Sequence, residues 1–440
     1  MEKVSVISLG CAKNLTDAEV MLSRLEKGGY EITYNEREAD IIIVNTCAFI
    51  DSAKQESIDT VLDVADLKKD AKLKLLIVAG CMGQRFSQEV LDELPEVDGV
   101  CGTGDFDDIV NVIKKVKDKR GAYLKGTEYA CLDTTDRILA TPPYTAYLKI
   151  AEGCSNHCTY CVIPKIRGKY KSRDMESILS EAELLVQNGV KELVLIAQDT
   201  SCYGKDLYGK NSLTVLLRKL SEIKNLEWIR VHYLYPEGVT DELIEEFKTN
   251  DKLVKYFDIP VQHISDNILK KMARRTDSGQ IKTLLEKIRT KVSGAVIRTS
   301  LIVGFPGETD EDFYKLYDFL KEYKLDRVGV FAYSREDTTP AAGFENQVDE
   351  QTKLDRKSRL EELLMEITEQ KNQQKIGKTV KVLVEGKDKV LKMYYGRTYA
   401  DSIDVDPKVF FKSDEPVKEG EFIQVKYTDY IDCDMIGEIL

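Results

Sequence analysis

Apolar and polar positions in residues 1–120 form short apolar runs, each followed by an amphipathic stretch. The runs at 4–9, 41–44, 75–79 and 97–100 predict strands, and the spacing at 15–27, 53–67 and 106–117 predicts helices. Alternating strands and helices are typical of a parallel sheet with helices on its faces. We therefore predict a parallel α/β domain over residues 1–120.

Residues 121–143 have few periodic apolar positions and end in two prolines, which interrupt both helices and strands, so this segment is predicted to be a linker. The alternation then resumes, with strand candidates at 147–151, 192–197, 228–234, 256–260, 296–303 and 327–333. Six strand–helix units over 144–335 predict an incomplete (βα)6 barrel, whose site would lie at the carboxyl ends of its strands.

In the last hundred residues the alternation of strands and helices is no longer found. Residues 336–376 are predicted to be a connecting loop and a charged spacer helix at 349–374. Period-two alternation at 379–384, 394–399, 422–428 and 435–439 then predicts a small, OB-like β-barrel over 377–440.

One loop carries three cysteines, Cys154, Cys158 and Cys161, within eight positions. Cysteine thiolates hold iron–sulfur clusters, normally four to a cubane, so three thiols leave one iron open to a ligand. The alternatives are a zinc site that uses His157 and three unpaired core thiols.

Three further cysteines, Cys11, Cys47 and Cys81, each follow a predicted strand. Open α/β sheets gather ligands at this edge, so we predict a second three-cysteine cluster, although cysteine is also a common buried residue. Cys101 follows the fourth strand, and spacing alone does not exclude it. The remaining cysteines have no partner spacing and are interpreted as structural: Cys131, Cys202 and Cys433.

Polar residues are expected at the mouth of the predicted barrel. Gln198 and Asp199 end its second strand, and Gln262 and His263 follow its fourth, although His263 alone is more typical of a structural histidine. Such groups can hydrogen-bond a ribose or an amino acid head group. Five cations in 165–173 form either a solvated loop or a rim that holds an anionic part of the substrate.

The CxxxCxxC spacing, with Tyr160 before the last cysteine, resembles the signature of the radical S-adenosylmethionine (SAM) enzymes. The resemblance implies a 4Fe-4S cluster on Cys154, Cys158 and Cys161 whose open iron chelates SAM. Residues near the predicted strand ends are then candidate SAM contacts: Tyr160, Gln198, Asp199, Gln262, Arg298, Gly304 and Tyr333.

The three predicted blocks together resemble the radical SAM methylthiotransferases, whose end domains are called UPF-type and TRAM. The motifs at 9–14, 45–54 and 80–85 are similar to the RimO branch, with Ala12 where that branch usually has proline. The resemblance implies that Cys11, Cys47 and Cys81 bind a second 4Fe-4S cluster, which would leave Cys101 as a bystander.

The implied reaction adds a methylthio group to the β carbon of an aspartate of small-subunit ribosomal protein S-twelve. General acid–base catalysis supplies only about 10²- to 10⁴-fold, too little to open an unactivated C–H bond, so a radical cofactor is needed. By the resemblance, one cluster reduces and cleaves SAM, and the other presents sulfur that a second SAM methylates. An electron donor such as flavodoxin or ferredoxin is expected.

The net charge of −12 makes nucleic acid an unfavourable main substrate. Residues 377–440 have ten Lys and Arg against thirteen Asp and Glu, which favours a basic protein partner. The residues expected to contact it are Asp401, Asp404, Asp406, Asp429, Asp432 and Asp434. The alternatives are a transfer RNA methylthiotransferase of the MiaB type, which modifies an adenosine, and a non-catalytic iron–sulfur electron-transfer protein.

The chain has no apolar run of about eighteen residues and begins without a signal-peptide pattern, so we expect a cytoplasmic protein with no membrane contact. In that reducing compartment its ten cysteines are metal ligands or core thiols rather than disulfides.

Overall fold

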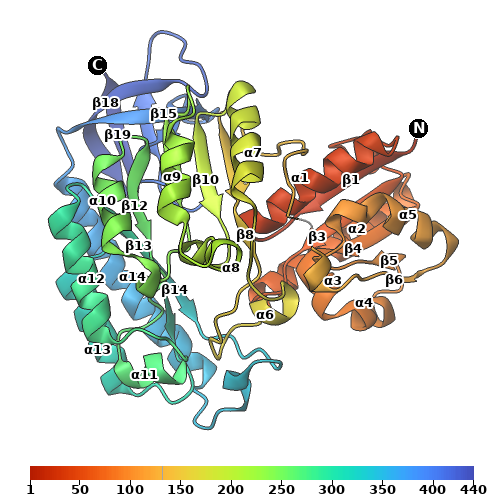
Figure 1. Cartoon of the computed structure of the whole chain (residues 1–440), viewed down its shortest axis with the longest axis horizontal. Helices are drawn as coiled ribbons and strands as arrows, with labels where there is room; N and C mark the ends of the chain where they lie inside the picture. Colours follow the sequence, from red (N-terminus) through yellow and green to blue (C-terminus); the bar gives the residue numbers. More distant parts are fainter. Residues whose placement is uncertain (131) are drawn as a thin grey trace.

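The computed structural model describes residues 1–130 and 132–440. It contains two six-stranded parallel sheets and a closed five-stranded barrel, in the order that the sequence predicts (Figure 1). The predicted fold class is therefore confirmed. No helix of the described residues has the length and apolar character needed to cross a membrane.

The N-terminal sheet has the strand order β2-β1-β3-β4-β5-β6. Its strands are β1 (Lys3–Ser8), β2 (Glu31–Ile32), β3 (Ile41–Thr46), β4 (Leu75–Ala79), β5 (Gly99–Val100) and β6 (Gly121–Ala122). Its helices are α1 (Ala12–Lys27), α2 (Asp51–Asp70), α3 (Gly80–Arg85), α4 (Ser87–Glu93) and α5 (Ile109–Asp118). The linker prediction is wrong for Gly121 and Ala122, because β6 is the last strand of this sheet.

The second sheet has the order β14-β13-β12-β11-β10-β7 and all its pairs are parallel. Its edge strands β7 and β14 are not paired with each other, so the barrel is incomplete as predicted. The strands are β7 (Thr145–Lys149), β10 (Glu192–Ile196), β11 (Trp228–Val231), β12 (Leu253–Asp258), β13 (Val296–Val303) and β14 (Arg327–Ala332). The longer helices are α7 (Met175–Gln187), α9 (Leu213–Ser221), α10 (Asp241–Thr249), α12 (Ser278–Lys291) and α13 (Asp310–Tyr323).

Helix α14 (Glu350–Gln373) begins after Asp349, whose side chain accepts a hydrogen bond from the Thr352 amide. Leu360, Leu363 and Ile367 are buried in the same apolar core as the barrel strands. The prediction of a spacer is therefore wrong, because this helix completes the outer wall of the barrel.

The C-terminal barrel closes in the order β15-β16-β17-β19-β18. Its strands are β15 (Thr379–Lys387), β16 (Tyr394–Arg397), β17 (Val409–Lys412), β18 (Phe422–Ile431) and β19 (Asp434–Ile439). Strand β17 was not predicted from the sequence; it pairs in parallel with β19 and closes the barrel.

The segment 398–406, between β16 and β17, contacts the inner face of the larger barrel. Ile403 is buried with Tyr147, Val194 and Ile196. Ser402 Oγ lies 2.8 Å from His232 Nε2 on the β11 side of this lumen. We call residues 398–406 the plug segment.

Two carboxylates of the plug segment bind the larger barrel. Asp401 pairs with Arg327 at 2.5 Å, and the hydroxyl of Tyr256 donates to Asp406 at 2.6 Å. The prediction that Asp401 and Asp406 contact an outside partner is therefore wrong, since both side chains are buried between the two barrels.

Candidate functional site

The ends of three parallel strands bring Cys11, Cys47 and Cys81 to one edge of the N-terminal sheet. Ser8 of β1, Asn45 of β3 and Ala79 of β4 lie in register, and each cysteine follows the end of its strand by one to three residues. We call these thiols the strand-end site.

Asn14 and two glycines allow these strand ends to approach one another. Asn14 donates to the carbonyls of Leu9 and Thr46 at 3.0 and 2.9 Å. Gly10 has φ +84°, and a Cβ there would lie 3.0 Å from Cys47 Sγ. Gly80 has φ +83°, and a Cβ there would lie 2.3 Å from an Asn45 oxygen. Side chains at either glycine would therefore push these segments apart.

The strand-end thiols differ in electrostatic surroundings. Burial opposes ionisation of Cys11, but the charges of Lys13 and Arg167 outweigh it and lower the pKa of that thiol. Burial raises the pKa of Cys47 and raises the pKa of Cys81 to about 12. A bound metal cation would reverse this effect and hold all three as thiolates.

Cys154, Cys158 and Cys161 lie on the loop between β8 (Ala151–Glu152) and β9 (Lys171–Ser172), and we call them the loop site. The amides of Asn156 and Ile163 point at the sulfurs of Cys154 and Cys161, at 3.4 and 3.5 Å. Such N–H groups stabilise ligating sulfurs.

Burial raises the pKa of Cys154 to about 11 and that of Cys161 to about 12. The hydroxyl of Tyr235 and the guanidinium of Arg274 both lie 3.9 Å from Cys158 Sγ. The loop site therefore combines thiols that need a metal to ionise with one cation held beside them.

Each site supplies three cysteine thiols as donors. Within residues 1–130 and 132–440, no three Cys, His, Asp or Glu side chains are grouped as ligands of a single metal ion would be. His157, the candidate zinc ligand, is exposed. In a cubane each cysteine binds a different iron, so its ligands stand around the cluster rather than converge. Three thiols in each site match the donor set of a three-cysteine cluster.

A buried ion network connects the two sites. Arg167 follows the loop site in the chain, and one nitrogen of its guanidinium pairs with Asp17 at 2.7 Å and with Glu152 at 3.2 Å. The other terminal nitrogen donates to Asn14 Oδ1 and lies 3.8 Å from Cys81 Sγ of the strand-end site. Lys149 pairs with the same two carboxylates. All these charged side chains are at most 5% exposed, so the network fixes the two thiol sites relative to each other.

Two of the five cations in 165–173 are not part of a solvated rim. Arg167 is in the network just described, and Arg173 pairs with the buried Glu181. The exposed cations of this segment are Lys165, Lys169 and Lys171. Either reading of the whole segment, as a solvated loop or as a substrate rim, is therefore wrong for its two arginines.

Three of the predicted SAM contacts lie together near the loop site. The ring of Tyr160 is 6.5 Å from that of Phe305, and the ring of Phe305 is 5.3 Å from that of Tyr333. Gly304 has φ +70°, and a Cβ there would lie 2.2 Å from Lys353 Cγ. The structure thus gives a packing reason for this glycine that the sequence did not indicate.

The other predicted SAM contacts follow neighbouring strands or, for Arg298, lie at the third residue of β13. Gln198 donates to Glu152 at 2.7 Å, and Asp199 accepts from Asn156 of the loop site at 2.9 Å. Arg298 pairs with Asp258 at 2.8 Å. Gln262 has φ +71°, a conformation rare for residues other than glycine, and such strain is typical of functional sites.

Sequence reasoning did not single out Tyr233, Tyr235 or Arg274. Tyr233 follows β11 with φ +60°, and Lys13 Nζ lies 3.6 Å from the centre of its ring. The aromatic residues at 232, 233 and 235, at the end of the predicted strand 228–234, were the available signal. Through this contact the start of α1 meets the carboxyl end of a barrel strand, which brings the two halves of the site face to face.

His263 and four cysteines were interpreted as structural or, for Cys101, as a bystander of the two sites. His263 is buried beside Glu308, with 3.6 Å between them. Cys101 is buried in the core of the N-terminal sheet, Cys202 donates to Asp199, and Cys433 is exposed. Cys131 lies outside the described residues.

Comparisons with known proteins cover the whole chain. Family models match residues 3–102 (uncharacterized protein family UPF0004), 148–320 (radical SAM superfamily) and 376–440 (TRAM domain). The ribosomal protein uS12 methylthiotransferase RimO of Acetivibrio thermocellus is 49% identical over 100% of this chain and 98% of its own length. The RimO of Clostridioides difficile is 48% identical over 100% of this chain and 99% of its length. The chain belongs to the RimO family. The resemblance drawn from the cysteine motifs is thus confirmed.

Solved structures share the fold of this RimO-family chain. TsrM from Kitasatospora setae, a radical SAM methyltransferase, has a TM-score of 0.58 at 15% identity, with 78% of this chain and 75% of that chain covered. The radical SAM enzyme OxsB has a TM-score of 0.52 at 13% identity, with 81% of this chain and 56% of that chain covered. At these identities the likeness concerns the fold alone.

Proposed function

We propose that this protein is a radical SAM methylthiotransferase that modifies an aspartate of ribosomal protein uS12 at its β carbon. Full-length similarity to RimO proteins supports the reaction and the substrate. The structural observation that carries the proposal is the pair of three-cysteine sites, joined by the buried network around Arg167.

Cys154, Cys158 and Cys161 are proposed to hold one 4Fe-4S cluster, and Cys11, Cys47 and Cys81 a second. When bound, the clusters and SAM supply the radical and sulfur-transfer chemistry that side chains cannot provide. The protein's contribution is to fix the thiols: backbone amides point at Cys154 and Cys161, and Arg167 lies beside Cys81.

Residues around the loop site are proposed to bind and orient SAM. Tyr160 and Tyr333 would supply an apolar wall, and the Tyr333 hydroxyl is buried without a hydrogen-bond partner among the described residues. Gln198 likewise has a buried oxygen without a partner in the described chain, which suits a ribose or amine donor. Asp199, Gln262, Arg298 and Gly304 remain proposed contacts.

Lys13 and Tyr233 lie where the two sites face each other and are proposed to line the path of the substrate aspartate. The partner surface is proposed to include the exposed carboxylates Asp404, Asp429 and Asp432 of the terminal barrel. A low-potential donor of the flavodoxin or ferredoxin type would deliver the electron.

The proposal can be tested with anaerobically reconstituted protein, SAM, a reductant, sulfide and purified uS12. Mass spectrometry is expected to find one methylthio group in place of one hydrogen on an aspartate, together with 5′-deoxyadenosine. A protein that modified transfer RNA instead, or that bound SAM without cleaving it, would contradict the assignment.

A further inference from the structure

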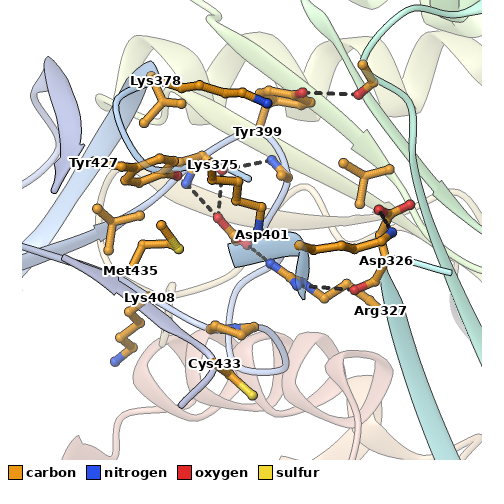
Figure 2. Close-up of a pocket in the computed structure, with 18 of the residues that line it drawn as sticks. Asp326, Arg327, Lys375, Lys378, Tyr399, Asp401, Lys408, Tyr427, Cys433 and Met435 are labelled. Carbon is orange, nitrogen blue, oxygen red and sulfur yellow. Dashed lines mark hydrogen bonds and ion pairs between the residues drawn. The ribbon is translucent and has the colours of Figure 1, made fainter. Parts of the chain in front are cut away.

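A cavity of about 260 Å³ lies where the two barrels and helix α14 meet (Figure 2). Gly294 and Ala295 before β13, Arg327 at the start of β14, Lys375 after α14, and Tyr427 of the terminal barrel are among its walls. These are the amino ends of the barrel strands. The six residues of β14 separate them from the carboxyl ends by about 20 Å, so the cavity is distinct from the thiol sites.

Cations outnumber carboxylates in this cavity. Asp401 pairs with Arg327 at 2.5 Å, and Asp326 pairs with Lys371. Three lysines remain, Lys375, Lys378 and Lys408, and no carboxylate of the described residues lies within ion-pair distance of any of them. The ammonium of Lys408 lies over the ring of Tyr395, 4.3 Å from its centre. Among the described residues, the Lys375 ammonium donates a hydrogen bond to the amide oxygen of Asn372 alone, at 3.0 Å.

The surroundings of Lys375 disfavour its charge while the cavity holds no anion. Burial and then the charge of Arg327 lower the pKa of Lys375 to about 8. The Arg327 Nε is also buried and makes no hydrogen bond within the described chain. A hydrogen-bond donor that is partly removed from water and has no acceptor raises the free energy of the folded protein. An anion that accepted hydrogen bonds from these donors would offset that cost.

We propose that this cavity is a binding site for a small multivalent oxyanion of the phosphate class. Apart from Lys408, its positive groups come from two parts of the chain, Arg327 of β14 and the lysines at or after the end of α14, and several cationic donors around one oxyanion are typical of phosphate recognition. The volume far exceeds the roughly 10–15 Å³ that one water needs but is below the ~300 Å³ at which drug-sized ligand pockets begin. The net charge of −12 repels a long polyanion, which would extend over the rest of the protein surface. A small anion inside the cavity interacts mainly with the positive groups of the cavity wall.

The test uses the full-length holoenzyme, with inorganic phosphate as the probe in titration calorimetry at constant ionic strength. We expect saturable one-to-one binding to the native protein. Lys375→Met is expected to weaken it about tenfold or more, since a charge-assisted hydrogen bond contributes ~1.5–3 kcal/mol. Lys378→Met, at a more exposed lysine, provides a second variant that leaves the helix end intact.

Lys389→Met is the matched control, because Lys389 is an exposed lysine of the same terminal barrel and lies outside the cavity. It removes the same charge and should leave phosphate affinity unchanged. Equal affinity in Lys375→Met, Lys378→Met and native protein would overturn the proposal, as would the absence of saturable binding. So would tight binding of a short RNA oligonucleotide by a protein that ignores phosphate.

Discussion

The loop site and the strand-end site hold the same number of thiols but differ in construction and charge. The loop site places Cys154, Cys158 and Cys161 on one short segment, whereas the strand-end site depends on three strands in register. Burial raises the pKa of Cys154 to about 11 in the first, and cations lower the pKa of Cys11 in the second.

This difference indicates how each site responds to damage. The loop site needs only its local turn and the groups around it, such as Arg274. The strand-end site needs the whole N-terminal sheet, and its Cys81 is also tied to the barrel through Arg167. We therefore expect mutations to separate the two sites, with Arg167 as the point at which they are coupled.

Replacement of all three loop-site cysteines by Ala should have the largest effect. SAM cleavage should be abolished, because no other part of the proposed site binds SAM to iron. Iron content of the reconstituted protein should fall to about half, since each of two cubanes holds four irons. Iron analysis and chromatography of 5′-deoxyadenosine measure both. Normal SAM cleavage by this variant would refute the division between the sites.

Arg167→Met should destabilise the protein by about 3–5 kcal/mol, because it leaves Asp17 and Glu152 buried with Lys149 as the one cation of the described residues paired with them. Urea denaturation measures this change. Lys169→Met removes an exposed charge from the same segment and should have little effect. Equal stability of the two variants would show that the network does not couple the sites.

Acid should destabilise the protein through His232. This residue precedes Tyr233, which takes part in the contact between the strand-end site and the barrel. Burial lowers the pKa of His232 from 6.5 to about 3. The unfolded chain therefore takes up a proton below pH 6.5 and the folded chain only near pH 3, so stability is lost as pH falls between these values.

At pH 5 the loss from this group should be about 2 kcal/mol relative to pH 8. Urea denaturation of the native protein and of His232→Gln at both pH values measures the part of this loss that His232 causes. Glu192 contributes little between pH 8 and pH 5, because its stabilisation is lost only as pH falls below about 4.5; the charges of Arg397 and Arg230 outweigh the effect of burial and lower its pKa from 4.5 to about 2. If the free energy of unfolding of His232→Gln fell between pH 8 and pH 5 as much as that of the native protein, His232 would not be the cause of the loss.

The smallest expected effect concerns the charge difference between the sites. Lys13→Met should raise the pKa of Cys11 and slow its alkylation by iodoacetamide at pH 7 in cluster-free protein. Cys161 in the loop site should react at the same rate in both proteins. Mass spectrometry of the labelled peptides measures the two rates, and an unchanged rate at Cys11 would show that Lys13 does not set its pKa.

The sequence predicted elements whose signal is local. The six barrel strands and the loop site could be read from apolar runs and from cysteine spacing. Strands β2 and β6 have two residues each, too few for a periodic pattern to emerge. They are strands only because a neighbouring strand supplies hydrogen-bond partners.

Contacts between distant segments could not be predicted in the same way. Arg167 and Asp401 are charged residues in polar stretches, and such residues are usually solvated. Both are buried because carboxylates or a guanidinium from another part of the chain compensate them. Helix α14 is charged along much of its surface, yet Leu360 and Leu363 are buried against the barrel.

The most direct test of the account uses the triple variant Cys11→Ala, Cys47→Ala and Cys81→Ala, reconstituted with iron and supplied with SAM, reductant and uS12. The account predicts that 5′-deoxyadenosine still forms, because the loop site is intact, and that uS12 gains no methylthio group. Loss of SAM cleavage in a variant that retains the loop-site cluster and binds SAM would contradict it, as would normal methylthiolation.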